Sequence, residues 1–150
     1  ALTYTTEPLT GAVEIVGHPV VHVWLQCSAD DVDLLACLEN VGPAGRSTYI
    51  ADGCLRASHQ IPSQAPYDRL GLPYSRSFEQ DATPLSDESA ELVFDLLPTA
   101  KHFPAGHRIR LAITCVDKDS YRHVERHSAP TIRLLRSASH PSPVILPVVR

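Results

Sequence analysis

The sequence contains no methionine, a single tryptophan and no C-x-x-C pair. It also has no apolar run approaching the length of a membrane-spanning helix, and no basic segment followed by an apolar one at its start. Neither a membrane span nor a signal peptide is therefore predicted. A chain that begins with Ala1 and holds no methionine is expected to be a piece of a longer protein, or a processed one.

An excess of positive charge is missing as well. The 13 basic and 17 acidic side chains give a net charge of -4 and are scattered along the chain. We therefore expect no nucleic acid and no membrane surface among the partners. The length of 150 residues fits one domain, and a chain of this size buries roughly two-thirds of its unfolded surface.

The cysteines do not have the spacing of a zinc site. They are Cys27, Cys37, Cys54 and Cys115. Each lies within or beside an apolar, strand-like run, where a free thiol behaves as a small hydrophobic side chain. We expect four buried, reduced thiols, and with them a cytoplasmic location.

The G-x-S-x-G motif that surrounds the nucleophile of many serine hydrolases is absent. Ser58 and His59 are neighbours, but adjacent side chains of a strand point to opposite faces. The histidine would then lie too far from the hydroxyl to act as its base. No glycine-rich loop that cradles phosphate occurs either. The sequence therefore predicts no catalytic residue and no cofactor.

Two segments carry the residue types of metal ligands. His123 and His127 would share one face of a helix, but their neighbours are typical of a loop and the intervening glutamate is misplaced for H-E-x-x-H. The segment 30–33 has three aspartates, but it lacks the glycine and the distal glutamate of a calcium-binding loop. A solvated loop and an ordinary turn are favoured, and no metal is predicted.

Short runs with strand-like patterns make up most of the chain. Residues 2–6, 12–16 and 20–27 alternate apolar and polar side chains, as half-buried strands do. The run 32–41 is more continuously apolar, which predicts a strand buried on both faces, with a short helix as the alternative. Further strands are expected at 46–51, after a turn at 42–45, and at 54–59, 91–97, 108–114, 131–135 and 144–149.

The segment 60–77 has little periodicity and is longer than an ordinary connection. Disorder is not expected, because the apolar side chains of Tyr67, Leu70, Leu72 and Tyr74 would have no use in a solvated linker. We predict an ordered excursion that packs on its own domain or on a neighbouring one.

The 13 prolines lie mostly between the expected strands, and no amphipathic helix interrupts them. Many short strands joined by long crossing loops predict an all-β fold, a β-sandwich with Greek-key or jelly-roll connections. Residues 1–150 are expected to form this one domain.

The most informative pattern lies at residues 95–114. A strand at 91–97 leads into a crossing loop with two prolines and a glycine, and a strictly alternating strand follows. In that last strand Ile109, Leu111 and Ile113 share one face, which is predicted to be core. Arg108 and Arg110 lie on the other, polar face.

Six segments, in this order and spacing, carry a resemblance to one family. They are LTYTTEPLT at 2–10, VEIVGHPVVHVWL at 13–25, DGCLRASH at 52–59, PYD at 66–68, DLLPT at 95–99 and HPSPVILPV at 140–148. The chain resembles the C-terminal β-domain of the X-prolyl dipeptidyl peptidases, cocaine esterases and cephalosporin acylases, which are serine hydrolases. The segment 120–130 matches no motif of that family and is unexpectedly basic.

The resemblance implies a jelly-roll sandwich, sometimes grouped with galactose-binding-like folds. It implies that this domain packs against an α/β-hydrolase catalytic domain and its helical cap, both absent from this chain. The catalytic serine, aspartate and histidine of the family belong to that other domain, so none is assigned here. The family hydrolyses esters, X-prolyl peptides and the acyl side chains of β-lactams.

The side chains expected to contact the catalytic and cap domains are Trp24, Tyr67, Leu72, Tyr74, Arg108 and Arg110. Two other interpretations stay open. In one, the chain is a carbohydrate- or ligand-binding module with Trp24 as a stacking platform, although Trp24 fits a buried role as well. In the other, the sandwich serves only for contacts within a homo-oligomer.

Overall fold

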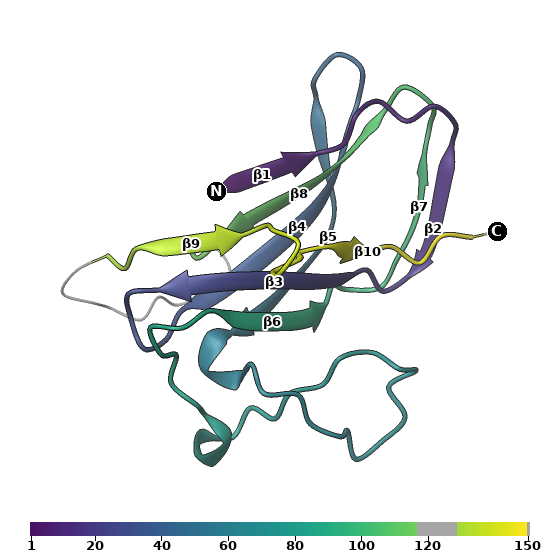
Figure 1. Ribbon diagram of the computed structural model, residues 1–150. Helices are drawn as coiled ribbons and strands as arrows, with labels where there is room; N and C mark the ends of the chain where they lie inside the picture. Colours follow the sequence, from purple (N-terminus) through teal and green to yellow (C-terminus); the bar gives the residue numbers. More distant parts are fainter. Residues whose placement is uncertain (117–128, 150) are drawn as a thin grey trace.

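The computed structural model describes residues 1–116 and 129–149. Within them the chain is almost entirely β-structure, which confirms the expected all-β class (Figure 1). The strands are β1 (Leu2–Thr5), β2 (Val13–Gly17), β3 (Val20–Cys27), β4 (Asp33–Val41), β5 (Ser47–Arg56), β6 (Ala90–Asp95), β7 (Thr99–Phe103), β8 (Arg108–Thr114), β9 (Ile132–Leu135) and β10 (Val144–Ile145). Two single-turn 3-10 helices, η1 (Ala57–His59) and η2 (Glu79–Asp81), complete the described elements.

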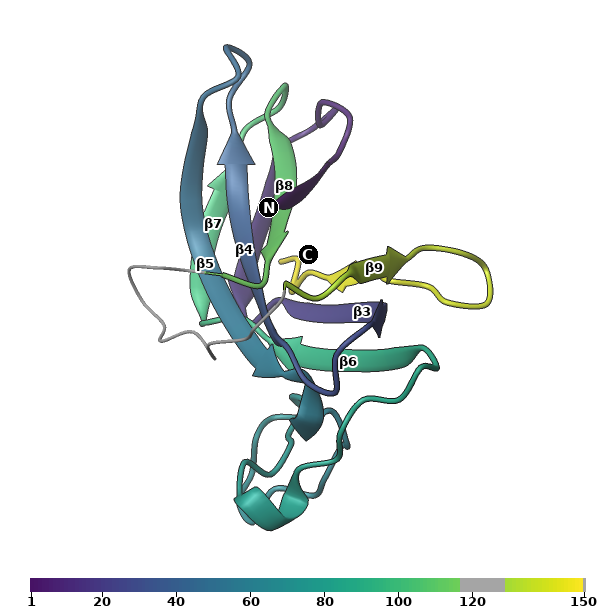
Figure 2. The same ribbon diagram turned by 90° about the vertical axis from the view of Figure 1, so that its left-hand side faces the viewer.

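Two antiparallel sheets pack face to face as a β-sandwich. The first has the strand order β1-β8-β4-β5, and the second has the order β10-β3-β6, with β9 also paired to β3. β2 and β7 form a separate two-stranded ribbon. Figure 2 shows that the strands of the first sheet cross those of the second steeply. The two sheets therefore meet closely at one corner, where β5 passes β6.

The core forms from the alternating strands, as their sequence predicts. In β3 every second side chain is buried, beginning with Val21 and ending with Cys27. In β8 Leu111 and Ile113 are buried, while Arg108 and Arg110 lie on the other face. Other fully buried side chains come from both sheets, the ribbon and the segment after β6: Ile15, Leu34, Leu38, Leu92, Leu96 and Phe103.

The apolar run 32–41 is a strand, which excludes the helical alternative. β4 lies between β5 and β8, and most of its side chains are buried. The turn at 42–45 closes as expected, with the Gly42 N–H donating to the Arg46 carbonyl (2.9 Å) and the Gly45 N–H to the Gly42 carbonyl (2.8 Å). The expectation of two separate arms at 46–51 and 54–59 is wrong, because β5 runs unbroken to Arg56 before η1 begins.

The expected crossing loop after residue 97 contains a strand that the sequence did not predict. β7 pairs with β2 along its whole length. The five residues of β7 carry no strict alternation, so this pairing decides their conformation. Phe103, at the end of β7, is fully buried, and His102 faces Glu14 across the ribbon at 3.0 Å between Nδ1 and Oε1.

Residues 60–83, called the excursion below, leave one end of the sandwich between β5 and β6 (Figures 1 and 2). The excursion is ordered by its own hydrogen bonds, in keeping with the expectation for 60–77. The Ser63 N–H donates to the Tyr74 carbonyl (2.8 Å), and the Leu72 N–H donates to the Arg69 carbonyl (3.0 Å).

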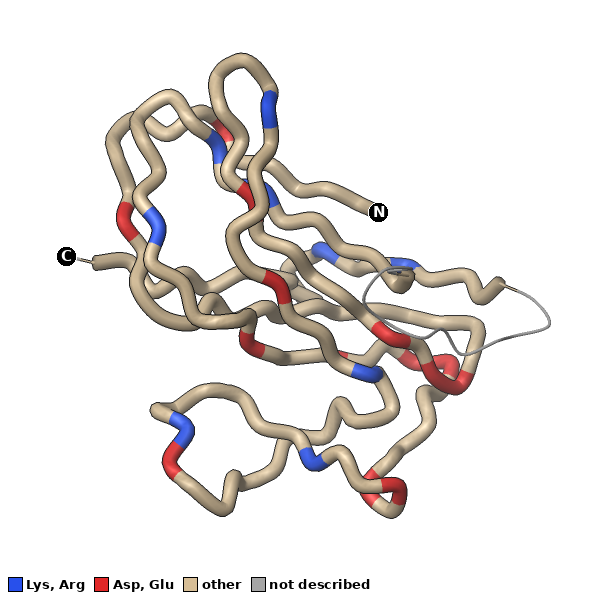
Figure 3. Tube along the Cα trace, turned by 180° about the vertical axis from the view of Figure 1, so that it is seen from behind, with Lys and Arg blue, Asp and Glu red and all other residues tan. Residues whose placement is uncertain are grey.

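Acidic and basic positions are interspersed over the described chain, in the sandwich and in the excursion alike (Figure 3). No helix among the described residues has the length and apolar character needed to cross a bilayer. The His123 and His127 pair and most of the basic segment 120–130 lie outside the described residues.

Candidate interaction site

Two of the sequence motifs meet where the two sheets touch. The Leu97 N–H donates to the Asp52 carbonyl at 2.9 Å, which joins the start of DGCLRASH to DLLPT. A Cβ atom on Gly53 would lie 2.5 Å from the Asp95 carbonyl oxygen and 3.1 Å from the Cα atom of Leu96. Because any side chain would collide with backbone here, glycine is what allows β5 to pass β6 so closely. These motif residues thus shape the fold.

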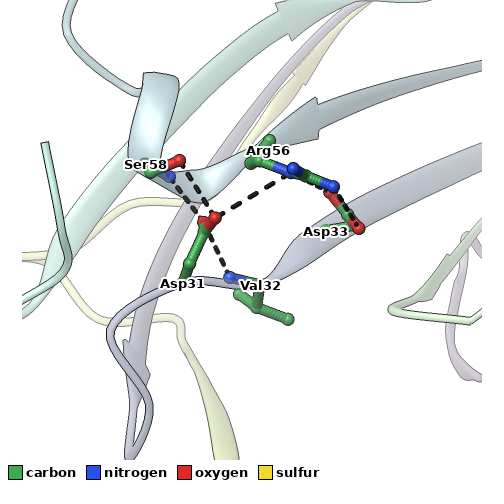
Figure 4. Close-up of polar contacts among 5 residues, drawn as sticks. All are labelled: Asp31, Val32, Asp33, Arg56 and Ser58. Carbon is green, nitrogen blue, oxygen red and sulfur yellow. Dashed lines mark hydrogen bonds and ion pairs between the residues drawn. The ribbon is translucent and has the colours of Figure 1, made fainter. Parts of the chain in front are cut away.

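The carboxylate of Asp31 joins the β3–β4 turn to η1 (Figure 4). It accepts hydrogen bonds from the Val32 N–H at 2.9 Å, the Ser58 N–H at 2.8 Å and the Ser58 hydroxyl at 3.0 Å. Beside it, Arg56 binds Asp33 through two nitrogens, at 2.8 and 3.2 Å. This bond raises the pKa of Arg56 above its usual value. The aspartates at 31 and 33 therefore serve as acceptors for protein donors.

Both ends of the excursion are fastened to the same turn. At its start the Ala57 N–H donates to the Val32 carbonyl (2.8 Å), in addition to the Asp31 bonds. Near its end the Thr83 N–H donates to the Ser58 carbonyl, and the Leu85 N–H donates to the Asp30 carbonyl, each at 2.7 Å. The segment leaves and rejoins the sandwich at one point.

The far part of the excursion is held to the sandwich by Asp95. One oxygen of Asp95 lies 2.8 Å from Arg69 Nη2, and the other lies 3.2 Å from His18 Nδ1. The Arg69 guanidinium also lies 5.8 Å from the ring centre of Tyr74, and Tyr67 meets the same ring edge-on at 6.1 Å. Asp95 of β6 therefore fixes the excursion through a partly buried ion pair, and two ring contacts within the excursion hold Arg69 and the tyrosines together.

Several large apolar side chains of the excursion point to solvent even though its backbone is fastened. The exposed fraction is 60% for Tyr67 and 83% for Leu70. Ile61 and Phe78 are exposed as well. Leu70 has a φ of 57°, in the left-handed region, and its N–H is held by the Asp68 carboxylate at 2.8 Å. An ordered segment that keeps a strained leucine in water is characteristic of a contact surface.

The excursion collects three of the six side chains that the sequence singled out. Tyr67 is exposed, Leu72 and Tyr74 are half-buried, and the two tyrosines are in contact. Sequence reasoning missed Leu70 as a contact candidate, since nothing in its local pattern distinguishes an exposed leucine from an anchoring one.

Trp24 lies elsewhere, on the outer face of β3. It is half-buried, and its ring meets His140 at 4.9 Å between ring centres, nearly perpendicular. The backbone N–H of Trp24 donates to the Ser142 hydroxyl at 3.0 Å. The chain's own segment before β10 thus packs against this tryptophan, which does not favour an open stacking platform for a sugar.

Arg108 and Arg110 lie on the first sheet and hold β1 to β8. Arg108 donates to the Thr6 carbonyl at 3.0 Å, and Arg110 donates to the Thr5 hydroxyl at 3.0 Å. Arg110 also lies 3.7 Å from Glu39. Both side chains thus have partners within the domain, and the six predicted contact residues fall in three separate places.

Ser58 and His59 lie in η1, which corrects the expectation that they belong to a strand. The Ser58 hydroxyl donates to Asp31, so it has a structural role. The Nδ1 atom of His59 is buried, and no described residue gives it a hydrogen bond.

All four cysteines are free thiols, but they are not all buried. Cys27 is buried, Cys37 and Cys115 are half-buried, and Cys54 is exposed on β5. The expectation is therefore wrong for Cys54, whose side chain points away from the core. Burial, together with the nearby Glu39 and Asp52 carboxylates, raises the pKa of the Cys37 thiol to about 11.

The motifs that carry the family resemblance thus shape the corner of this β-sandwich and fasten its excursion. The model of one family, described as the X-Pro dipeptidyl-peptidase C-terminal non-catalytic domain, matches residues 1–144. The chain belongs to this family. Its expected place among the C-terminal domains of hydrolases of the cocaine esterase type is thereby confirmed.

Two relatives illustrate the relationship. A Mycobacterium bovis protein that bears the name of a serine esterase is 42% identical over 151 residues, which cover 99% of this chain and 24% of the relative. The cocaine esterase of a Rhodococcus species is 26% identical over 161 residues, which cover 99% of this chain and 25% of the enzyme. The chain thus spans about a quarter of the length of these relatives.

Solved structures show the same fold. A CocE/NonD family hydrolase from Staphylococcus aureus superposes with a TM-score of 0.81 at 20% identity, over 99% of this chain and 30% of that one. An alpha-amino acid ester hydrolase superposes with a TM-score of 0.74 at 23% identity, over 99% of this chain and 25% of that one.

Proposed function

We propose that this domain is the non-catalytic partner of an α/β-hydrolase domain in a longer polypeptide. That polypeptide would hydrolyse esters, X-prolyl peptides or acyl amides through a catalytic serine outside this chain. Family membership and the names of the relatives support the proposal. In it, the domain contacts the catalytic domain and its helical cap and holds them in place.

The observation that carries the proposal is the combination of order and exposure in the excursion. Its two ends are fastened at Asp31 and Ser58, and its far part is fastened at Asp95. It nevertheless exposes Tyr67 and Leu70 to water. Contacts between domains of one chain bury roughly 600–1,500 Å², and a fixed apolar patch of this kind provides the centre of such a contact.

The first test concerns catalysis. Residues 1–150 should not hydrolyse p-nitrophenyl acetate above a heat-inactivated control, while the longer polypeptide should. The reading frame upstream of Ala1 should encode G-x-S-x-G after an apolar strand, followed by the aspartate and the histidine of a triad. Turnover by residues 1–150 alone would contradict the proposal.

The second test concerns the contact. Leu70→Asp should lower the melting temperature of the longer polypeptide by several degrees, because burying a leucine contributes about 1.5–3 kcal/mol. It should leave the melting temperature of residues 1–150 unchanged, since Leu70 is 83% exposed there. Val16→Asp, at a position 60% exposed on β2, is the matched control. Equal effects of Leu70→Asp on both proteins would place the contact elsewhere.

A further inference from the structure

The two sheets separate at the edge opposite the Gly53 corner and leave an apolar cleft between them. Its volume is about 360 Å³, which lies within the roughly 300–1,000 Å³ usual for small-molecule pockets. One wall comes from β1, β4 and β8 of the first sheet, and the other comes from β3, β9 and β10 of the second. Leu38, Leu111 and Ile113 line the first wall, and Val23, Leu134 and Val144 line the second.

A single cation lies among the residues that line the cleft. The guanidinium carbon of Arg136 lies 4.7 Å from the ring centre of Tyr4, and both side chains line the cavity. Arg136 is exposed. Within the described part of the chain no acidic residue forms an ion pair with it. Stacking on Tyr4 orients the guanidinium, and no hydrogen bond or ion pair among the described residues engages its donors.

Several of the other polar side chains of the lining already have partners within the domain. His22 binds the Glu91 carboxylate through Nδ1 at 3.0 Å. The Thr5 hydroxyl accepts from Arg110, and the Ser142 hydroxyl donates to the Leu135 carbonyl at 2.7 Å. A ligand rich in hydroxyl groups would therefore lose its hydration among aliphatic side chains with few compensating bonds. A cation would face the charge of Arg136.

We propose that this cleft binds an amphipathic carboxylate, namely a medium-chain fatty acid. The aliphatic tail lies between the two sheets, and the carboxylate pairs with the Arg136 guanidinium, which has the fork geometry to bind both oxygens. This site is separate from the excursion, and the proposal does not depend on the domain's contact with a hydrolase.

Isothermal titration of residues 1–150 with decanoate tests the site, and 1-decanol and glucose serve as comparison ligands. Decanoate should bind at one saturable site, decanol should bind about tenfold more weakly, and glucose should not bind. Arg136→Ala should weaken decanoate binding about tenfold, which corresponds to the loss of one charge-assisted pair. The same substitution should leave the affinity for decanol unchanged.

Two further variants separate the cleft from the rest of the surface. Arg133→Ala removes an exposed cation from β9, the strand that ends just before Arg136, next to the cleft residue Leu134, and should not change decanoate binding. Leu134→Trp should fill the cleft and abolish binding, while the urea unfolding midpoint shows whether the variant is folded. The proposal would be overturned if Arg133→Ala and Arg136→Ala lowered the affinity for decanoate equally. Equal affinities of the parent protein for decanoate and decanol, or no saturable binding of decanoate, would overturn it as well.

The longer polypeptide provides the last comparison. Decanoate should bind it with the affinity measured for residues 1–150. Loss of binding in the longer polypeptide would overturn the fatty-acid site, because it would show that another part of the protein occupies the cleft.

Discussion

Gly53→Ala should destabilise the domain strongly, although alanine adds one methyl group to a position within a strand. The new Cβ would lie 2.5 Å from the Asp95 carbonyl oxygen, 3.0 Å from Leu96 Cδ2 and 3.1 Å from Leu96 Cα. Two of these three atoms belong to the backbone, so a change of side-chain rotamer cannot remove the collision. β5 and the segment after β6 must move apart.

The expected cost has two parts. Forcing an extra methyl group into a packed interior costs about 1–3 kcal/mol. Moving the strands apart also strains the hydrogen bond from the Leu97 N–H to the Asp52 carbonyl, now 2.9 Å long, and losing such a bond costs about 1 kcal/mol. The sum is about 2–4 kcal/mol, a large part of the roughly 5–15 kcal/mol by which domains are stable.

Urea unfolding followed by Trp24 fluorescence measures this cost. At an unchanged m value, the midpoint of Gly53→Ala should fall by about 1–2 M. Gly11→Ala is the matched control, since no atom of the described residues other than its chain neighbours lies within 4 Å of its added Cβ, and its free energy of unfolding should stay within about 0.5 kcal/mol of the parent. A Gly53→Ala midpoint equal to that of the control would refute the account of the corner.

Three further outcomes follow from the described contacts. Asp31→Ala should lower the free energy of unfolding by about 1–3 kcal/mol, because it removes an acceptor of several hydrogen bonds. It should also speed proteolysis within residues 60–83, and an unchanged rate of cleavage would argue that Asp31 does not hold the excursion in place. At pH 8 iodoacetamide should alkylate the exposed Cys54 before Cys37, because the pKa of the Cys37 thiol is raised to about 11, mainly by burial. Peptide mass mapping measures the order of alkylation, and earlier labelling of Cys37 would contradict the prediction. Tyr49 should stay protonated until about pH 12, because its hydroxyl donates to Asp52, and Tyr49→Phe should remove this last step from a titration at 295 nm; an unaltered curve would contradict the assignment.

The strands with strict alternation were predictable from the sequence because one of their faces is core. β3 and β8 occupy the predicted residues, and their apolar faces are buried as expected. β7 was not predictable in this way, since its five residues take their conformation from pairing with β2. The break expected between strands 46–51 and 54–59, at Asp52-Gly53, was wrong for a related reason. There glycine serves a close approach between sheets, which local patterns do not reveal.

The candidate site was predictable in part. The length of segment 60–77 and its aromatic side chains indicated an ordered excursion, and the two tyrosines at 67 and 74 are in contact. The exposure of Leu70 was not predictable, because Leu70 and Leu72 look alike in the sequence. Only the path of the backbone makes one exposed and the other half-buried. Nor could the sequence reveal the cleft, whose walls come from strands far apart in the chain.

The excursion begins and ends at almost the same point, since the Thr83 N–H and the Ser58 carbonyl are joined at 2.7 Å. A shorter or longer segment could therefore span the same pair of anchors without moving a strand. Doubling the length of such a segment costs only about 0.6 kcal/mol of closure entropy. Evolution could thus exchange the part that we propose contacts a partner while the sandwich stays as it is. The same junction offers protein engineers a place to graft a foreign loop.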